Sequence, residues 1–134
     1  MKAHIQKEPR CVLLWNFGPL NAGYDHLVRT ASSFGLKVRS VGPAELSARV
    51  GDLCTGRHAP AGAPLPSPTD HAAMIISGLR HDDGSLGHFV DEVRRGGAAI
   101  ALRAMVTPTS KTWTLAQLLL ELNQEHDAVG EDRT

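Results

Sequence analysis

The first half of the chain alternates between segments whose apolar and polar residues follow strand and helix patterns. A short apolar run at 12–17 predicts a buried strand, and apolar residues at helical spacing predict a helix over 24–34. Gly35 follows at the position of a helix C-cap. Apolar and polar residues alternate over 36–41, so we expect a strand with one face on the core and the other in solvent. A short helix over 43–50 begins with a proline, which suits the first turn of a helix.

The second half repeats this order of segments. The apolar run 73–79 predicts another buried strand, and Ser85 is placed to cap a following helix. Gly96 and Gly97 end that helix, and the apolar run 99–106 predicts a fourth strand. The apolar stripe of the helix consists of Leu86, Phe89, Val90 and Val93.

The two halves correspond to each other at a nearly constant offset. Leu14 corresponds to Ile76 at an offset of 62 residues, and Pro43 to Pro108 at 65. Two strand–helix–strand units in tandem predict an α+β fold of the ferredoxin-like plan, a four-stranded antiparallel sheet with helices on one face, followed by a C-terminal helix. We expect the first and third strands to be central neighbours that run parallel to each other. The alternation over 36–41 favours a sheet with one wet face, and a small doubly wound parallel α/β sheet is the alternative.

A segment rich in proline and glycine separates the halves. No periodic apolar pattern survives over 55–70, so we predict a mobile loop there, within a single domain spanning 1–134. The alternative, which we disfavour, is a proline-rich motif for a partner protein. The prolines in this window are Pro60, Pro64, Pro66 and Pro68.

Composition narrows the classes of function. The 14 basic and 14 acidic residues cancel, so no global field draws the chain to nucleic acid or to an anionic membrane. Only 4% of the residues are aromatic, which disfavours a surface that stacks bases. Cys11 and Cys54 fit neither a redox nor a zinc spacing, and we expect both to stay reduced thiols in the cytoplasm. We expect neither a signal peptide nor a membrane-spanning segment.

The C-terminal helix carries a complete set of start signals. Thr114 is the predicted N-cap, and Gln117 is placed to form a capping box with it. Trp113 and Leu118 occupy the two positions of a hydrophobic staple. These signals predict a helix held firmly at its first turn.

The second half of the chain also resembles a known family. Three segments carry the resemblance: Met74-Ile75-Ile76-Ser77-Gly78-Leu79, Leu102-Arg103-Ala104-Met105-Val106-Thr107-Pro108-Thr109, and Trp113-Thr114-Leu115. Over about 74–126 the chain is similar to a small bacterial family known only as a domain of unknown function. Leu79, Arg103 and Ser110 stand where that family usually has an aromatic residue, a lysine and an asparagine. The resemblance implies a shared fold over this region and no reaction.

The exits of the first and third strands form the predicted ligand site. If these strands are parallel neighbours, Asn16 and Gly18 lie beside Ser77 and Gly78, and each pair leads into a helix N-terminus. Backbone amides at the glycines, together with Arg80, would then bind a small anion. The alternative is that the glycines only permit tight turns.

A hydroxyl-rich turn before the last helix is the second candidate. Thr107, Thr109, Lys111 and Trp113 would form a binding lip or interface loop there. The alternative is that these hydroxyls only stabilise the turn and cap the helix.

The remaining candidates for chemistry are weaker. His88 and Asp91 share one helical face, and His81 precedes two aspartates, but such groups are common on surfaces and we predict neither a metal nor a cofactor. Ser77 lacks the motif of a nucleophile elbow. The sequence therefore favours a non-catalytic module that senses a small anionic ligand or binds a protein, with self-association through an exposed sheet face or edge. The alternative is a small enzyme that acts on an anionic metabolite at the strand exits.

Overall fold

Four strands form one sheet in a computed structural model that describes residues 9–56 and 65–132. Their order across the sheet is β2-β1-β3-β4. The strands are β1 Cys11–Trp15, β2 Lys37–Val41, β3 Ala73–Ser77 and β4 Leu102–Met105. The helices are α1 Tyr24–Ser33, α2 Val50–Thr55, α3 Ser85–Arg95 and α4 Leu115–Asp132, with 3-10 turns at Pro43–Glu45 and Ser110–Thr112. The predicted α+β class is confirmed.

The sheet is mixed, which differs from the predicted ferredoxin-like plan. β1 and β3 are the central neighbours, as predicted, but they pair antiparallel. β1 pairs parallel with β2, and β3 pairs parallel with β4. Each crossover helix therefore joins two adjacent strands, whereas the ferredoxin-like plan places another strand between them. The predicted parallel pairing of the first and third strands is wrong.

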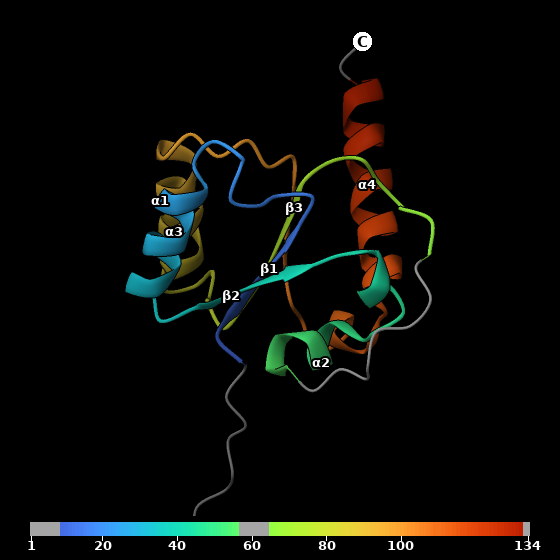
Figure 1. Ribbon diagram of the computed structural model, residues 1–134, viewed down its shortest axis with the longest axis horizontal. Helices are drawn as coiled ribbons and strands as arrows, with labels where there is room; N and C mark the ends of the chain where they lie inside the picture. The colour runs from blue at the N-terminus through green and yellow to red at the C-terminus, as the bar shows by residue number, and fades with distance from the viewer. Residues whose placement is uncertain (1–8, 57–64, 133–134) are drawn as a thin grey trace, which may run out of the picture.

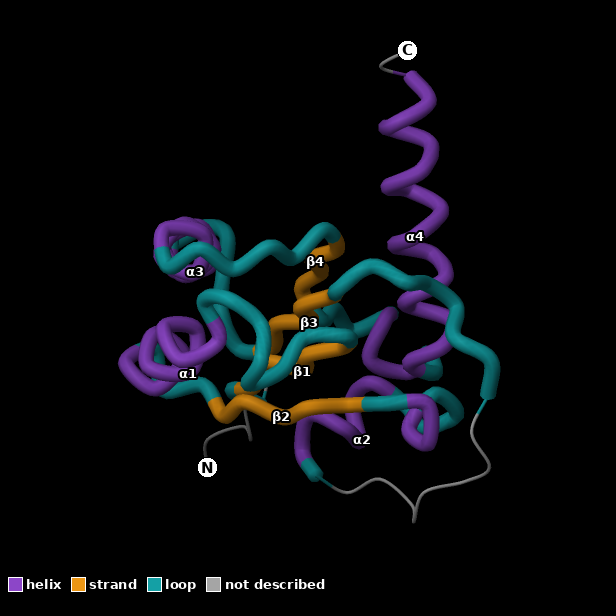
Figure 2. The backbone as a smooth tube through the Cα atoms, turned by 45° about the horizontal axis from the view of Figure 1, so that its top comes forward, coloured by secondary structure: helices purple, strands orange, loops and turns teal. Residues whose placement is uncertain are grey.

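Helices cover both faces of the sheet, not one face as predicted (Figures 1 and 2). α1 and α3 pack on one face, and α2 and α4 pack on the other. All five residues of β1 and all five of β3 are buried, which is what two covered faces require. The alternation in β2 reflects its place at the sheet edge, where side chains on both faces are partly exposed.

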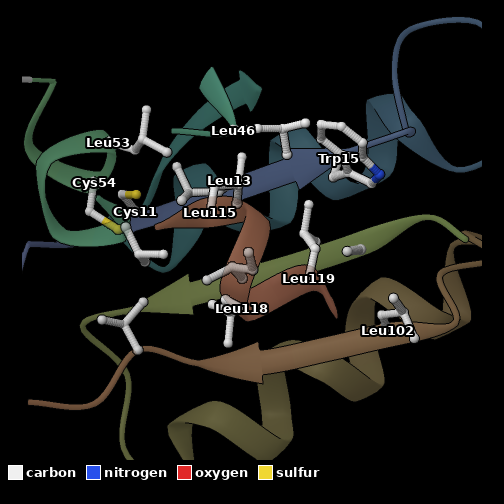
Figure 3. Packing of buried hydrophobic residues seen from close by; sticks show 14 residues of the cluster. Cys11, Leu13, Trp15, Leu46, Leu53, Cys54, Leu102, Leu115, Leu118 and Leu119 are labelled. Carbon is white, nitrogen blue, oxygen red and sulfur yellow. The ribbon is translucent and has the colours of Figure 1, made fainter. Parts of the chain in front are cut away.

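The α2/α4 face is closed by a cluster of large side chains (Figure 3). Trp15 is only 2% exposed, and its indole N–H donates to the Thr69 carbonyl at 3.4 Å. Cys11 and Cys54 lie side by side at the other end of this cluster, and neither is in a disulfide. A hydrogen bond with Cys54, together with burial, raises the pKa of Cys11 far above its ordinary value.

The predicted duplication is visible throughout the fold. Adding 62 to the residue numbers of β1 gives those of β3. Asn16 and Gly78, at the same offset, follow these strands with positive φ angles of 55° and 96°. The two halves are thus related by an approximate twofold axis that passes between β1 and β3.

A second contact lies near the same axis. Arg49 and Thr114, 65 residues apart, form an isolated antiparallel bridge where α2 and α4 begin. The Val50 amide donates to the Trp113 carbonyl at 2.9 Å, and the Leu115 amide donates to the Ala48 carbonyl at 2.9 Å. The two donors, Val50 and Leu115, are 65 residues apart, and so are the two acceptors, Ala48 and Trp113, so the pseudo-symmetry extends to individual hydrogen bonds.

Several predicted boundaries need correction. The helix predicted over 43–50 is a 3-10 turn, and α2 begins at Val50, where that helix was expected to end. The N-cap of α3 is Gly84 and not Ser85, whose hydroxyl accepts from the Arg80 amide at 3.0 Å. Of the predicted loop at 55–70, residues 57–64 lie outside the described part of the chain, and 65–70 contain no helix or strand.

The predicted capping box at the start of α4 is confirmed. The Gln117 amide donates to the Thr114 hydroxyl at 3.2 Å, and the Thr114 amide donates to the Gln117 side-chain oxygen at 2.9 Å. Each side chain thus satisfies a backbone amide that the helix leaves without a partner.

Replacing the cap residue should destabilise the fold. We expect Thr114→Ala to lower the free energy of unfolding by about 1 kcal/mol, because it removes the capping hydroxyl. Urea unfolding followed by circular dichroism measures the change. Thr114→Ser keeps the hydroxyl and is the matched control. Equal unfolding midpoints for the alanine variant and the wild type would contradict a stabilising cap.

The buried thiols should resist modification. Cys11 is 1% exposed and Cys54 is 3% exposed, and the raised pKa keeps the Cys11 thiol protonated. We expect a thiol-specific disulfide reagent at pH 8 to label the two cysteines only after denaturation. Leu20→Cys is the control, because Leu20 is fully exposed in a loop and should label at once. Rapid labelling of the native wild type would show that the cluster opens.

Candidate interaction site along the β4 edge

The predicted ligand residues lie at opposite ends of the sheet. In the antiparallel ladder Cys11 pairs with Ser77 and Trp15 pairs with Ala73. The exit of β1, with Asn16 and Gly18, is therefore a full strand length from Ser77, Gly78 and Arg80 at the exit of β3. The structure does not bring the five residues together, so the anion site predicted from paired exits does not form.

At the β1 exit, Asn16 holds two segments together. Its side-chain amide donates to the Thr69 carbonyl at 3.3 Å and to the His71 carbonyl at 3.5 Å. The Gly18 amide donates to the Asn21 side chain at 2.7 Å, which closes the turn before α1. The positive φ of Asn16 suits this turn, because asparagine tolerates the left-handed region better than most residues.

At the β3 exit, local contacts occupy Arg80. Its guanidinium binds the Asp82 carboxylate, with Nε 2.8 Å from Oδ1, and both side chains are exposed. This contact raises the pKa of Arg80 and lowers the pKa of Asp82. The Ser77 hydroxyl is buried and has no hydrogen-bond partner within the described chain. The Gly78 carbonyl accepts from Arg10 at 3.1 Å.

The hydroxyl-rich turn is largely explained by bonds within itself. The Thr107 amide donates to the Ser110 hydroxyl at 2.9 Å, and the Ser110 amide donates to the Thr107 hydroxyl at 3.0 Å. The Thr109 carbonyl accepts from the Thr112 hydroxyl at 2.8 Å. Trp113 is half-buried against the α2/α4-face cluster, and Lys111 forms no ion pair with any residue whose position is described. These contacts support the turn interpretation.

The outer edge of β4 presents unpaired backbone groups. The amides of Leu102 and Val106 donate to β3-side carbonyls, those of Ala72 and Ile76, at 3.1 and 2.8 Å. Because bonding alternates along a parallel strand, the N–H and C=O groups of Arg103 and Met105 point away from β3. β4 lies at the outside of the sheet between α3 and α4 (Figure 2), so this edge is open to another strand.

Depressions adjoin β4 on the α1/α3 face. Met74 pairs with Arg103 and belongs to the cluster on this face, so the Arg103 side chain leaves the strand here. A depression of about 260 Å³ lies toward the β4 exit and a smaller one of about 90 Å³ toward its start, and Arg103 lines both. The larger is lined by Ile76, His81, Leu86, Val90, Arg103, Ala104 and Met105.

A third depression, of about 230 Å³, lies on the α2/α4 face between the start of β4 and α4. Its apolar lining comes from Ala101, Leu102 and Leu122, and its polar lining from Arg103, Glu125 and His126. The His126 ring packs edge-on against His71, with 4.6 Å between ring centroids. Glu125 is exposed and forms no ion pair with the residues placed in the structure.

No group of three histidine, cysteine, aspartate or glutamate side chains is arranged to hold a metal ion in the described ranges. His88 and Asp91 are exposed on α3, and Asp91 lies 3.9 Å from Arg94. None of the helices in those ranges is both long and apolar enough to span a membrane.

The β4 edge was not predicted as a site. In the sequence Arg103 stood out only as a departure from a family pattern, and Met105 did not stand out at all. Edge position follows from strand order, which apolar patterning does not encode. The one available signal was the charged Arg103 in the fourth strand, since β1 and β3 contain no charged residue.

The fold and site define a three-layer α/β/α protein with an open strand edge. Residues 72–129 match the model of a family described as a domain of unknown function, DUF3783. The resemblance predicted over 74–126 is thereby confirmed, and the matched residues span β3, α3, β4 and most of α4. Comparison with curated proteins and with solved structures finds no match.

Amide exchange should report the open edge directly. We expect the amides of Arg103 and Met105 to exchange with solvent at rates close to those of an unfolded chain, because they have no acceptor. The amides of Leu102 and Val106, bonded to the β3 side, should exchange much more slowly. NMR-detected hydrogen exchange measures both sets. Equal protection of the two sets would mean that the edge is already covered in solution.

Proposed function

We propose that this protein is a non-catalytic interaction module of the bacterial cytoplasm that binds an extended segment of a partner protein along β4. The observation that carries the proposal is the outward direction of the Arg103 and Met105 backbone groups, between depressions on both faces of the sheet. Strand addition of this kind draws affinity from main-chain hydrogen bonds and selectivity from side-chain pockets on alternate sides.

The other sheet edge is less suited to this role. β2 carries Lys37 and Arg39, which lie on the α2/α4 face because they pair with Cys11 and Leu13. Charged side chains on an edge strand commonly oppose pairing with another chain. β4 carries a single charge over its four residues, Arg103, between apolar neighbours.

The alternative functions require residues that do not lie together in the fold. A small enzyme or an anion sensor at the exits of the first and third strands needs Asn16 and Arg80 at one site, and the antiparallel ladder separates them. Self-association through an exposed sheet face is also disfavoured, because helices cover both faces. The predicted cytoplasmic location suits two buried, reduced thiols.

A proline at the β4 edge should abolish strand addition. Met105→Pro removes an outward N–H that β3 does not use, so the fold should persist. Its binding to fluorescein-labelled six-residue strand-forming peptides of varied charge, measured by fluorescence anisotropy, should be at least about tenfold weaker.

Ser40→Pro is the matched control, because the Ser40 amide points outward from the opposite edge strand, β2. We expect this variant to bind like the wild type. Binding that survives Met105→Pro, or a peptide set in which nothing binds the wild type, would overturn the proposed function.

A further inference from the structure

The two faces beside β4 differ in chemistry, and this difference specifies what can bind. A strand added to β4 would direct successive side chains alternately to the α1/α3 face and to the α2/α4 face. Each face then selects every second residue of the added segment. The preference of each face follows from the residues that line its depressions.

The α1/α3 face selects an aliphatic side chain and disfavours a basic one. Its larger depression is walled by Ile76, Leu86 and Val90, and about 260 Å³ accommodates a valine or leucine side chain. Arg103 stands beside it, and Arg94 lines the neighbouring depression. A lysine or arginine directed to this face would therefore meet two like charges.

The α2/α4 face selects a basic side chain. Its depression has an apolar floor that includes Leu102 and Leu122, along which the methylene stem of a lysine or arginine can lie. Glu125 stands at its rim with no ion pair to a described residue. Arg103 also lines this depression, but its side chain leaves the strand on the α1/α3 face. Glu121, one turn earlier on α4, adds a second exposed negative charge near the same helix face.

We infer that the partner segment alternates aliphatic residues with lysine or arginine, the aliphatic side chains entering the α1/α3 face and the basic ones the α2/α4 face. This inference rests on the proposed strand addition at β4. It names the partner by the chemistry of its sequence: a short extended stretch, amphipathic with a period of two.

A second copy of this chain fits the same edge poorly. Antiparallel pairing of two β4 strands about a twofold axis keeps each residue on its own face. Arg103 of the second copy would then enter the α1/α3 face beside Arg103 and Arg94. The α2/α4-face depression would receive Ala104, which carries no charge to meet Glu125. Self-pairing therefore mismatches both faces.

Three matched peptides test the alternation. All have valine at alternate positions of six residues, and the remaining three positions are lysine, threonine or glutamate. We expect the valine–lysine peptide to bind the full chain about tenfold more tightly than the valine–glutamate peptide, with the valine–threonine peptide between them. Added salt should narrow the difference.

Variants of Glu125 test whether this residue causes the preference for the lysine peptide. Glu125→Gln should remove most of the advantage of the lysine peptide, and Glu125→Lys should reverse the order of the lysine and glutamate peptides. Asp25→Lys, an equivalent charge change on exposed α1, should leave the order unchanged. Circular dichroism confirms that each variant is folded.

The outcomes separate this inference from the proposed function. Equal binding of the three peptides, lost with Met105→Pro, would overturn the alternation and leave strand addition standing. Preference for lysine that persists with Glu125→Gln would also overturn it. Dimers in analytical ultracentrifugation that Met105→Pro dissociates would make the occupant a second copy. Binding unaffected by Met105→Pro would remove the proposed function itself.

Discussion

The antiparallel ladder between β1 and β3 joins the two halves of the sheet, and most features of the molecule depend on it. Because these strands are central, each is covered on both faces and every residue of each is buried. Because they run in opposite directions, the exit of β1 lies beside the start of β3, and the exits of the two crossover units point to opposite ends. The same pairing places β2 and β4 on the outside. The position of the open edge is thus a consequence of how two similar halves meet, and not of any local feature of β4.

The second face of the sheet shows why the halves need each other. Neither α2, with six residues, nor the first turns of α4 could cover a four-stranded sheet alone. They start side by side at Arg49 and Thr114, joined by two equivalent hydrogen bonds, and run to opposite ends of the sheet. α4 covers Trp15 through Leu119, whereas α2 brings Cys54 against Cys11 (Figure 3). α4 is longer than α2, and its additional turns form the rim of the α2/α4-face depression beside β4. The β4 edge therefore differs from the β2 edge, although the two halves are otherwise similar.

Features that depend on neighbouring residues could be predicted from the sequence. The periods of apolar residues predicted most of the helices and strands, and the 62-residue offset indicated the duplication. Thr114 and Gln117, three residues apart, predicted the capping box. The order of the strands across the sheet could not be predicted, because two tandem strand–helix–strand units have the same order of elements along the chain in both plans. The alternation over 36–41 marks an edge strand, not an open face of the sheet. The uninterrupted apolar runs of β1 and β3 were the better guide, since only strands covered on both faces need them. The site was missed for the same reason, because the edge position of Arg103 and Met105 follows from long-range pairing.

The extent of the family match bears on where function resides. Residues 72–129 form one of the two halves, and every residue that lines the three depressions beside β4 lies within them. The first half contributes nothing to that lining. Its central strand instead covers the inner edge of β3, which in a lone half would be as open as the outer edge of β4. A half with two open edges could pair with an added strand at either edge. It would not distinguish a strand of a partner protein from a strand of another copy of the chain. Because β1 pairs with β3, the matched half keeps one open edge, the outer edge of β4. The α1/α3 and α2/α4 faces beside this edge differ in chemistry.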